Sequence, residues 1–144
     1  MLTMKKYNFL ILIIVFCLMG SFNNTAKSQC NDDDFLDNCA ELLDTYTFIK
    51  SFPHADVGNG KKSENPYVFS TGHSYVLTVC DQGSSKMVIN LYDRNRKLIA
   101  TNKANGKYFN KVGYNCTATG VYYIETYLDN NAKGCGVSIL GFKK

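Results

Sequence analysis

The side chains that could support catalysis are few and do not form a recognised motif. The sequence contains two histidines, His54 and His73. A hydrolytic triad needs a histidine beside a nucleophile and an orienting acid, and neither G-x-S-x-G nor H-E-x-x-H occurs. Residues 57–63, VGNGKKS, resemble a phosphate-binding loop, but Lys62 stands where Ser or Thr is required, which favours a plain flexible loop. The sequence therefore predicts that the protein is not an enzyme.

The cysteines favour disulfide bonds over metal binding or nucleophilic catalysis. No pair has the C-x-x-C spacing of a zinc site. If residues 1–28 are removed as argued below, the disulfide candidates are Cys30, Cys39, Cys80, Cys116 and Cys135. Five cysteines cannot all pair within one chain, so one is free or bonds to another chain. Cys80 would meet Cys135 if the strands that carry them are antiparallel neighbours. Cys39 could then bond to Cys116, which would leave Cys30 unpaired. Other arrangements remain open.

An N-terminal signal peptide is predicted for residues 1–28. Lys5 and Lys6 precede an unbroken apolar run at residues 9–19, and residues 26–28, AKS, have the small-x-small pattern of a cleavage site. The run is shorter than the roughly 20 apolar residues of a membrane-spanning helix. We therefore expect cleavage and no stable membrane insertion afterwards, with an uncleaved N-terminal anchor as the alternative.

The remaining chain, residues 29–144, is predicted to be one exported domain of nearly neutral charge. The formal net charge of the whole sequence is +4, but Lys5, Lys6 and Lys27 lie in the predicted signal. Without these three lysines the net charge is close to zero, which is not typical of proteins that bind nucleic acid or anionic membranes. We expect a secreted or periplasmic protein with no nucleic-acid partner.

Hydrophobic periodicity predicts one helix followed by many strands. Residues 31–44, within an N-terminal helical segment at 29–45, place apolar side chains at helical spacing. The polar, glycine-containing stretch at 53–66 is predicted to be a loop. The expected strands, separated by turn residues, are residues 46–52, 67–70, 73–81, 87–93, 98–102, 108–116, 121–128 and 135–142. This pattern predicts an all-β fold, an antiparallel, jelly-roll-like β-sandwich with one short N-terminal helix, stabilised by disulfides, in which the last two strands form a hairpin.

Three stretches that contain four of these strands resemble a known family. The stretches YVFSTGHSYVLTV (67–79), MVINLYD (87–93) and TGVYYIET (119–126) are similar to the bacterial pre-peptidase C-terminal domain, a small secreted β-sandwich. The stretches LYDRNRKLIATN (91–102) and GCGVSILGF (134–142) resemble small secreted proteins of Bacteroidetes-type bacteria. The resemblance implies an exported, non-catalytic β-sandwich of the kind that assists secreted enzymes.

A cluster of carboxylates near the predicted helix start is the candidate metal site. Asp32, Asp33, Asp34 and Asp37 could together bind calcium, which takes six to eight oxygen ligands. The simpler interpretation is that these negative charges complement the helix dipole on a solvated first turn. No other cofactor is expected.

Exposed aromatic side chains are the candidate ligand-binding residues. In residues 121–128, VYYIETYL, alternation places Tyr123 and Tyr127 on the face that also carries a glutamate, and therefore on the outer face. Tyr108 and Phe109 could join them on the surface. Tyrosines on a sandwich surface can stack on sugars or anchor a protein partner, although the absence of tryptophan weakens the case for a sugar.

These observations predict a secreted, non-catalytic binding or adhesion module for an extracellular polymer or a protein. The alternative is a structural or complex-forming subunit that associates through the odd cysteine or an exposed strand edge. The sequence leaves the identity of the partner and the oligomeric state open.

Overall fold

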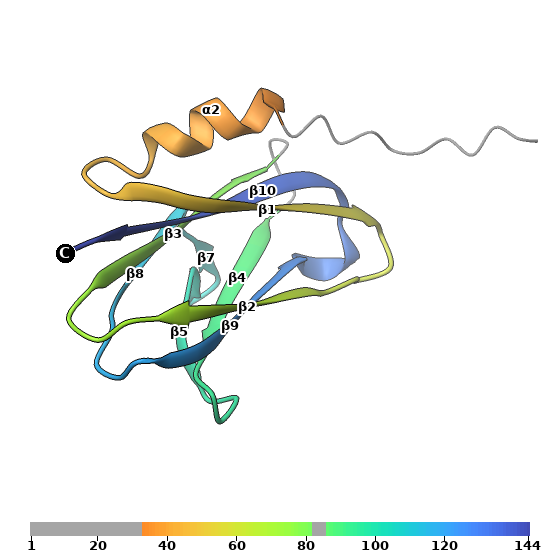
Figure 1. Cartoon of the computed structure of the whole chain (residues 1–144). Coiled ribbons are helices and arrows are strands. Elements are labelled where there is room, and N and C mark those ends of the chain that lie inside the picture. The colour runs from red at the N-terminus through yellow and green to blue at the C-terminus, as the bar shows by residue number, and fades with distance from the viewer. Residues whose placement is uncertain (1–32, 82–85) are drawn as a thin grey trace, which may run out of the picture.

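The computed structural model of the chain describes residues 33–81 and 86–144 and consists mainly of two antiparallel sheets (Figure 1). Sheet A has the strand order β1-β10-β3-β8, sheet B the order β2-β9-β4-β5, and β6 and β7 form a small separate hairpin. The elements are α2 (Asp33–Glu41), β1 (Thr47–Val57), β2 (Ser63–Phe69), β3 (Ser74–Asp81), β4 (Met87–Tyr92), β5 (Leu98–Thr101), β6 (Lys103–Ala104), β7 (Lys107–Tyr108), β8 (Lys111–Asn115), β9 (Gly120–Leu128), a 3₁₀ turn η1 (Asp129–Asn131) and β10 (Lys133–Lys143). The predicted antiparallel β-sandwich with a short N-terminal helix is confirmed.

The chain crosses repeatedly from one sheet to the other. Strands β1, β3, β8 and β10 belong to sheet A, while β2, β4, β5 and β9 belong to sheet B, so β4 and β5 are the sequential pair that shares a main sheet. The predicted hairpin of the last two strands is therefore wrong. The 3₁₀ turn η1, in which Asn130 and Asn131 have positive φ, carries the chain from β9 across to β10 instead.

The core lies between the two sheets and follows the period-2 alternation of the strands. In β9, the residues predicted to face inward are buried and their neighbours are partly exposed, so that prediction is confirmed. Met87, Ile89 and Leu91 of β4 belong to the same core. The two sheets thus bury one apolar face each and leave one outer face each.

Helix α2 covers the outer face of sheet A (Figure 1). Cys39 and Leu43 are buried against Val76 of β3 and against Val137 and Ile139 of β10. A nine-residue helix is marginal by itself, so packing of its apolar stripe on the sheet is what stabilises it. The predicted helix is confirmed within the described residues, although it ends at Glu41 and not at residue 44.

The stretch at 53–66 that was predicted to be a loop is mostly strand. Only residues 58–62 connect β1 to β2. Both strands lie at sheet edges, where Pro53 and Pro66 are tolerated because one side of an edge strand makes no ladder hydrogen bonds. His54 consequently lies in a strand and is buried, not in a polar loop.

The described disulfide joins Cys39 to Cys80, so the predicted pairing of Cys80 with Cys135 is wrong. Strands β3 and β10 are neighbours, but their register places Cys80 opposite Val137, two residues beyond Cys135. Such diagonal neighbours are about 7–8 Å apart, which is beyond the usual Cα separation of a disulfide. The Cα atoms of Cys39 and Cys80 are 5.5 Å apart, and the bond ties α2 to sheet A.

The other cysteines also depart from the predicted arrangement. Cys116 is a buried free thiol, so the predicted bond between Cys39 and Cys116 is wrong as well. Cys135 is disulfide-bonded. Cys30, which was predicted to be left over, lies outside the described residues.

Candidate functional site

The outer face of sheet B is the candidate binding surface, because α2, the one α-helix among the described residues, covers the opposite sheet (Figure 1). Alternation directs every second side chain of β2, β9 and β4 outward from this sheet. We call this surface the open face. It is made of Glu64, Pro66, Val68, Asn90, Tyr92, Leu98, Val121, Tyr123, Glu125 and Tyr127.

One half of the open face is apolar. Register places Val68 opposite Val121, and it places Tyr123 between Pro66 of β2 and Tyr92 of β4. Leu98 of β5 lies opposite Tyr92 and extends the same row. Val68, Leu98 and Val121 are 59%, 47% and 39% exposed; the two valines are cross-strand neighbours, and Leu98 lies at the other edge of the same face.

The other half of the open face is a polar network around Glu125. One carboxylate oxygen, Oε1, accepts hydrogen bonds from Asn90 Nδ2 at 3.0 Å, from the Tyr92 hydroxyl at 3.2 Å and from Lys62 Nζ at 3.3 Å. Burial and the adjacent charge of Glu125 raise the pKa of Tyr92. Burial alone would lower the pKa of Lys62, but its hydrogen bond and attraction to Glu125 outweigh this and raise it. The network thus moves the pKa values of Tyr92 and Lys62 further above neutral pH, where both groups are already protonated.

Two cations cover the aromatic rings of the open face. Lys62 Nζ lies 4.7 Å from the centroid of the Tyr127 ring, and the Arg96 guanidinium carbon lies 3.6 Å from that of Tyr123. Arg96 also forms an ion pair with Glu64 of β2. Cation–π contacts of this kind hold each ring in place and occupy one of its faces.

The structure separates the four predicted ligand-binding residues into two places. Tyr123 and Tyr127 lie on the open face, as the alternation predicted. Tyr108 lies in β7, where its hydroxyl donates to Asp129. The neighbouring Phe109 is 52% exposed. The hydrogen bonds from Lys103 and Tyr108 hold the pKa of Asp129 below its usual value, which ties this small hairpin to the turn after β9.

Sequence reasoning missed the polar residues of the open face: Lys62, Asn90, Tyr92 and Glu125 in the network, and Arg96 over the Tyr123 ring. The charge of Glu125 was used only to decide that the tyrosines on the same side of its strand face outward. Lys62 and Arg96 come from connections before β2 and between β4 and β5, and their partners are 63 and 32 residues away in sequence. No local pattern marks such contacts.

The predicted calcium site stays a prediction. Asp32 lies outside the described residues, while Asp33 and Asp34 begin α2 and Asp37 is exposed on it. In residues 33–81 and 86–144, no three His, Cys, Asp or Glu side chains are grouped as metal ligands. No helix within these ranges is long and apolar enough to cross a membrane.

We expect the free energy of unfolding to fall as the pH rises above about 10, the usual pKa of tyrosine. The pKa values of Tyr92 and Tyr122 are raised in the folded state, so the unfolded chain loses these protons first and alkali favours unfolding. Tyr92→Phe and Glu125→Gln should each make the alkaline decline shallower in urea unfolding between pH 8 and 11.5. An unchanged decline in both variants would contradict this assignment.

Comparisons with known proteins show a similarity of fold. No protein-family model matches the chain, and no curated protein matches it significantly. One similar structure is PliG from Aeromonas hydrophila, a periplasmic lysozyme inhibitor of g-type lysozyme, with a TM-score of 0.52 and 14% identity over 67% of this chain and 88% of that chain. Another is the pre-peptidase C-terminal domain of collagenase from Bacillus anthracis, with a TM-score of 0.52 and 18% identity over 67% of this chain and 90% of that chain. The predicted resemblance to the pre-peptidase C-terminal domain is thus confirmed at the level of fold.

Proposed function

We propose that this chain is an exported, non-catalytic module that binds another protein through the open face. The observation that carries the proposal is the grouping of three exposed apolar side chains, Val68, Leu98 and Val121, around Tyr123. Apolar groups left in water on a small domain mark an interaction surface. Tyrosine and arginine at its centre are residue types that often dominate binding energy at protein interfaces.

The arrangement of the rings favours a protein over a polysaccharide as the partner. A sugar binds to an aromatic platform by lying on its face, and Lys62 and Arg96 already occupy ring faces of Tyr127 and Tyr123. A protein can instead pair with these cations and pack on the neighbouring apolar row.

The histidines support a non-catalytic function. His54 Nδ1 lies 3.1 Å from the Ser63 hydroxyl, but the ring of His54 is only 2% exposed, so a substrate could not reach it. His73 lies at the β2–β3 connection, where its Nδ1 is 3.3 Å from the carbonyl of Thr71. The burial of His54 and the contact of His73 with a carbonyl of its own turn do not provide the exposed histidine beside a nucleophile that a triad requires.

Export is supported by the predicted signal at residues 1–28 and by the disulfide chemistry, since structural disulfides persist in oxidising compartments. Association through the odd cysteine has less support. Cys116 is buried, and its thiol donates to the carbonyl of Ala118. It could bond to another chain only if the β8–β9 loop opened.

The proposal predicts that Tyr123→Ala weakens binding to a protein partner by about thirtyfold or more, the loss expected for a central interface tyrosine. The immobilised protein is exposed to the secreted and periplasmic proteins of its host, and the retained partner is purified and titrated against each variant. Phe48→Ser is the matched control, because Phe48 is 48% exposed but belongs to sheet A.

Parallel depletion assays on insoluble cellulose, chitin and peptidoglycan test the competing class of partner. Saturable binding to one of these polymers that is lost in Tyr123→Ala would overturn the proposal in favour of a polysaccharide-binding module. Partner binding that Tyr123→Ala and Phe48→Ser reduce equally would show that the open face is not the binding surface.

A further inference from the structure

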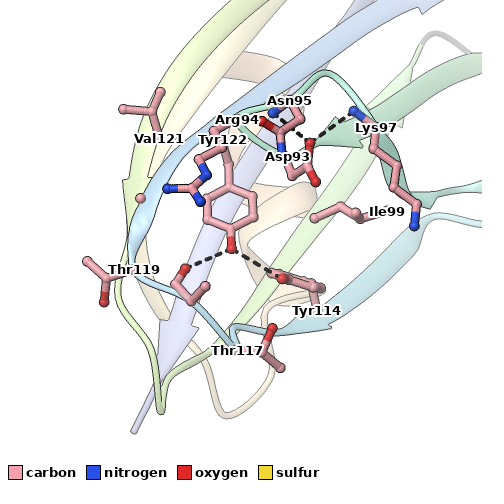
Figure 2. A pocket seen from close by; sticks show the side chains of 12 residues that line it. Asp93, Arg94, Asn95, Lys97, Ile99, Tyr114, Thr117, Thr119, Val121 and Tyr122 are labelled. Atoms are coloured by element: carbon pink, nitrogen blue, oxygen red, sulfur yellow. Dashed lines mark hydrogen bonds between the residues drawn. The ribbon is translucent and has the colours of Figure 1, made fainter.

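A hollow lies at the end of the sandwich, next to the open face. It has a volume of about 330 Å³ and lies between residues 93–97, which join β4 to β5, and residues 116–119, which join β8 to β9 (Figure 2). Val121 lines this hollow, which we call the end pocket, and also belongs to the open face. A partner bound on the open face would therefore reach the mouth of the end pocket.

The end pocket carries an excess of one positive charge. Arg94 and Lys97 line it, and neither forms an ion pair with a carboxylate of residues 33–81 or 86–144. The carboxylate of Asp93 also lines it, but its Oδ1 accepts the backbone N–H groups of Asn95 at 2.8 Å and of Lys97 at 2.9 Å. That oxygen is held by the turn. The two cations and one anion leave a net charge of +1.

The walls of the end pocket also offer hydroxyl groups. The Tyr122 hydroxyl donates to the carbonyl of Ala118 at 2.8 Å and lies 3.3 Å from the Tyr114 hydroxyl. Because the Tyr122 hydrogen is committed, Tyr114 must donate its own hydrogen to the Tyr122 oxygen, so neither tyrosine has a hydrogen left for a ligand. Thr119 Oγ1 accepts the N–H of Thr71 at 2.9 Å, so its own hydrogen is left to donate. The wall thus adds one hydroxyl donor, that of Thr119, to the two cations.

Figure 2 shows how these groups are arranged. The ring of Tyr122 lies at the centre of the view with its hydroxyl directed to Tyr114, and Tyr122 and Ile99 lie between the side chains of Arg94 and Lys97. The exposed cations thus flank a floor of aromatic and aliphatic carbon. A ligand that fits this arrangement has one negative charge at its tip and apolar atoms behind it.

We propose that the end pocket binds the carboxylate of an acidic side chain that the protein partner carries beside its contact with the open face. This inference rests on the proposed function and names the chemistry of the partner. Arginine recognises carboxylates through paired N–H donors, and the single excess charge matches a monoanion better than a phosphate dianion. The volume is at the lower end for ligand pockets, which suits one side chain better than a cofactor.

The test uses short peptides, so it does not need the natural partner. The protein is produced with ¹⁵N by export into an oxidising compartment and titrated with N-acetyl-Val-Glu-Val-amide and with its Val-Gln-Val counterpart. We expect saturable shifts of the amide signals of Thr119, Gly120 and Val121 with the glutamate peptide, with a Kd on the order of 1 mM. Binding of the glutamine peptide should be about tenfold weaker or absent.

Two variants of equal charge locate the effect. Arg94→Gln should weaken binding of the glutamate peptide by about tenfold, whereas Lys107→Gln in the β6–β7 hairpin should leave it unchanged. Both positions are exposed, so both variants should fold, which the remaining amide signals report. A peptide with a glycine in place of the glutamate and a free C-terminus tests whether a chain end can supply the carboxylate.

Every outcome decides the matter. The inference is overturned if the two capped peptides bind with equal affinity or if neither binds. It is also overturned if inorganic phosphate binds more tightly, if the free C-terminus is preferred, or if Arg94→Gln and Lys107→Gln cause equal losses. If a partner depends on Tyr123 while the glutamate peptide does not bind, this inference fails and the proposed function stands. If the glutamate peptide binds through Arg94 but no partner depends on Tyr123, the carboxylate site stands and the proposed function fails.

Discussion

Replacing both Cys39 and Cys80 with alanine is expected to lower the free energy of unfolding by about 4 kcal/mol, the chain-entropy value for a loop of this length. The bond closes a sequence separation of 41 residues that includes β1, β2 and most of β3. It also anchors α2, whose stripe shields Val76, Val137 and Ile139 from water. Among the described residues, packing and the hydrogen bond from the Thr78 hydroxyl to the Cys39 carbonyl would then remain to hold this short helix on sheet A.

The double variant is the informative one, because a single alanine would leave the other thiol free to pair wrongly. Urea unfolding followed by circular dichroism gives the free energy, and Cys116→Ala is the control, since it removes a thiol that is not in a disulfide. Cys116→Ala should cost clearly less. A double variant as stable as Cys116→Ala would contradict the assigned role of the bond. Binding through the open face, which belongs to the other sheet, should survive wherever the double variant is folded.

The strands could largely be predicted from the sequence because each carries its own period. In β9, the glutamate at 125 distinguishes the outer face from the inner one, and the buried residues Tyr122, Ile124 and Leu128 follow from it. Such alternation is a local property, since a strand with one buried face needs apolar side chains at every second position. The stripe of α2 was predictable for the same reason, with a different period.

The pairing of strands could not be predicted in the same way. The stretch DNNAKG, residues 129–134, joins β9 to the start of β10 and is rich in residues that form turns in either a hairpin or a crossing between sheets. The outcome depends on β2 and β4 flanking β9, while β1 and β3 flank β10. The disulfide shows the same limit: neighbouring strands were inferred for Cys80 and Cys135, but their register, which excludes the bond, is set by the whole sheet.

The open face was half predictable. Tyr123 and Tyr127 follow from alternation within one strand, whereas the network around Glu125 needs the register of β9 against β4 and a lysine from the connection before β2. Arg96 lies within the turn that the Asp93 carboxylate holds, and its positive φ is a property of that turn. The surface chemistry of a sandwich therefore depends on contacts that no single segment encodes.

Asn102 is the clearest case of a residue whose role only the structure reveals. It follows β5 directly, where an asparagine is an ordinary turn former. Its side chain is instead 1% exposed. The side-chain amide forms hydrogen bonds to the backbone of β4 in the way that a further peptide group of β5 would. Its Oδ1 accepts the N–H of Ile89 at 2.8 Å, and its Nδ2 donates to the carbonyls of Met87 at 3.0 Å and Phe109 at 2.9 Å.

Asn102→Ala is therefore expected to lower the free energy of unfolding by about 3 kcal/mol or more, because three buried backbone groups lose their partner at about 1–3 kcal/mol each. The exposed Asn110 supplies the control: Asn110→Ala should cost less than about 0.5 kcal/mol. If the two alanine variants are equally stable in urea unfolding, the bonds of Asn102 do not hold β4 as described.

Asn102→Asp separates the loss of donors from the loss of volume. The carboxylate keeps the shape of the amide and can still accept from Ile89, but it places a buried negative charge against the carbonyls of Met87 and Phe109. Burial and these carbonyls disfavour the charged form, so the folded pKa of the new carboxyl should lie above its unfolded value. Its protonated form then stabilises the fold below the unfolded pKa, and this contribution is lost as the pH rises through the folded pKa. Asn102→Asp should thus be closest to the wild type near pH 4 and fall furthest below it at pH 7, whereas a difference that stays constant with pH would show that the two carbonyls do not face this side chain.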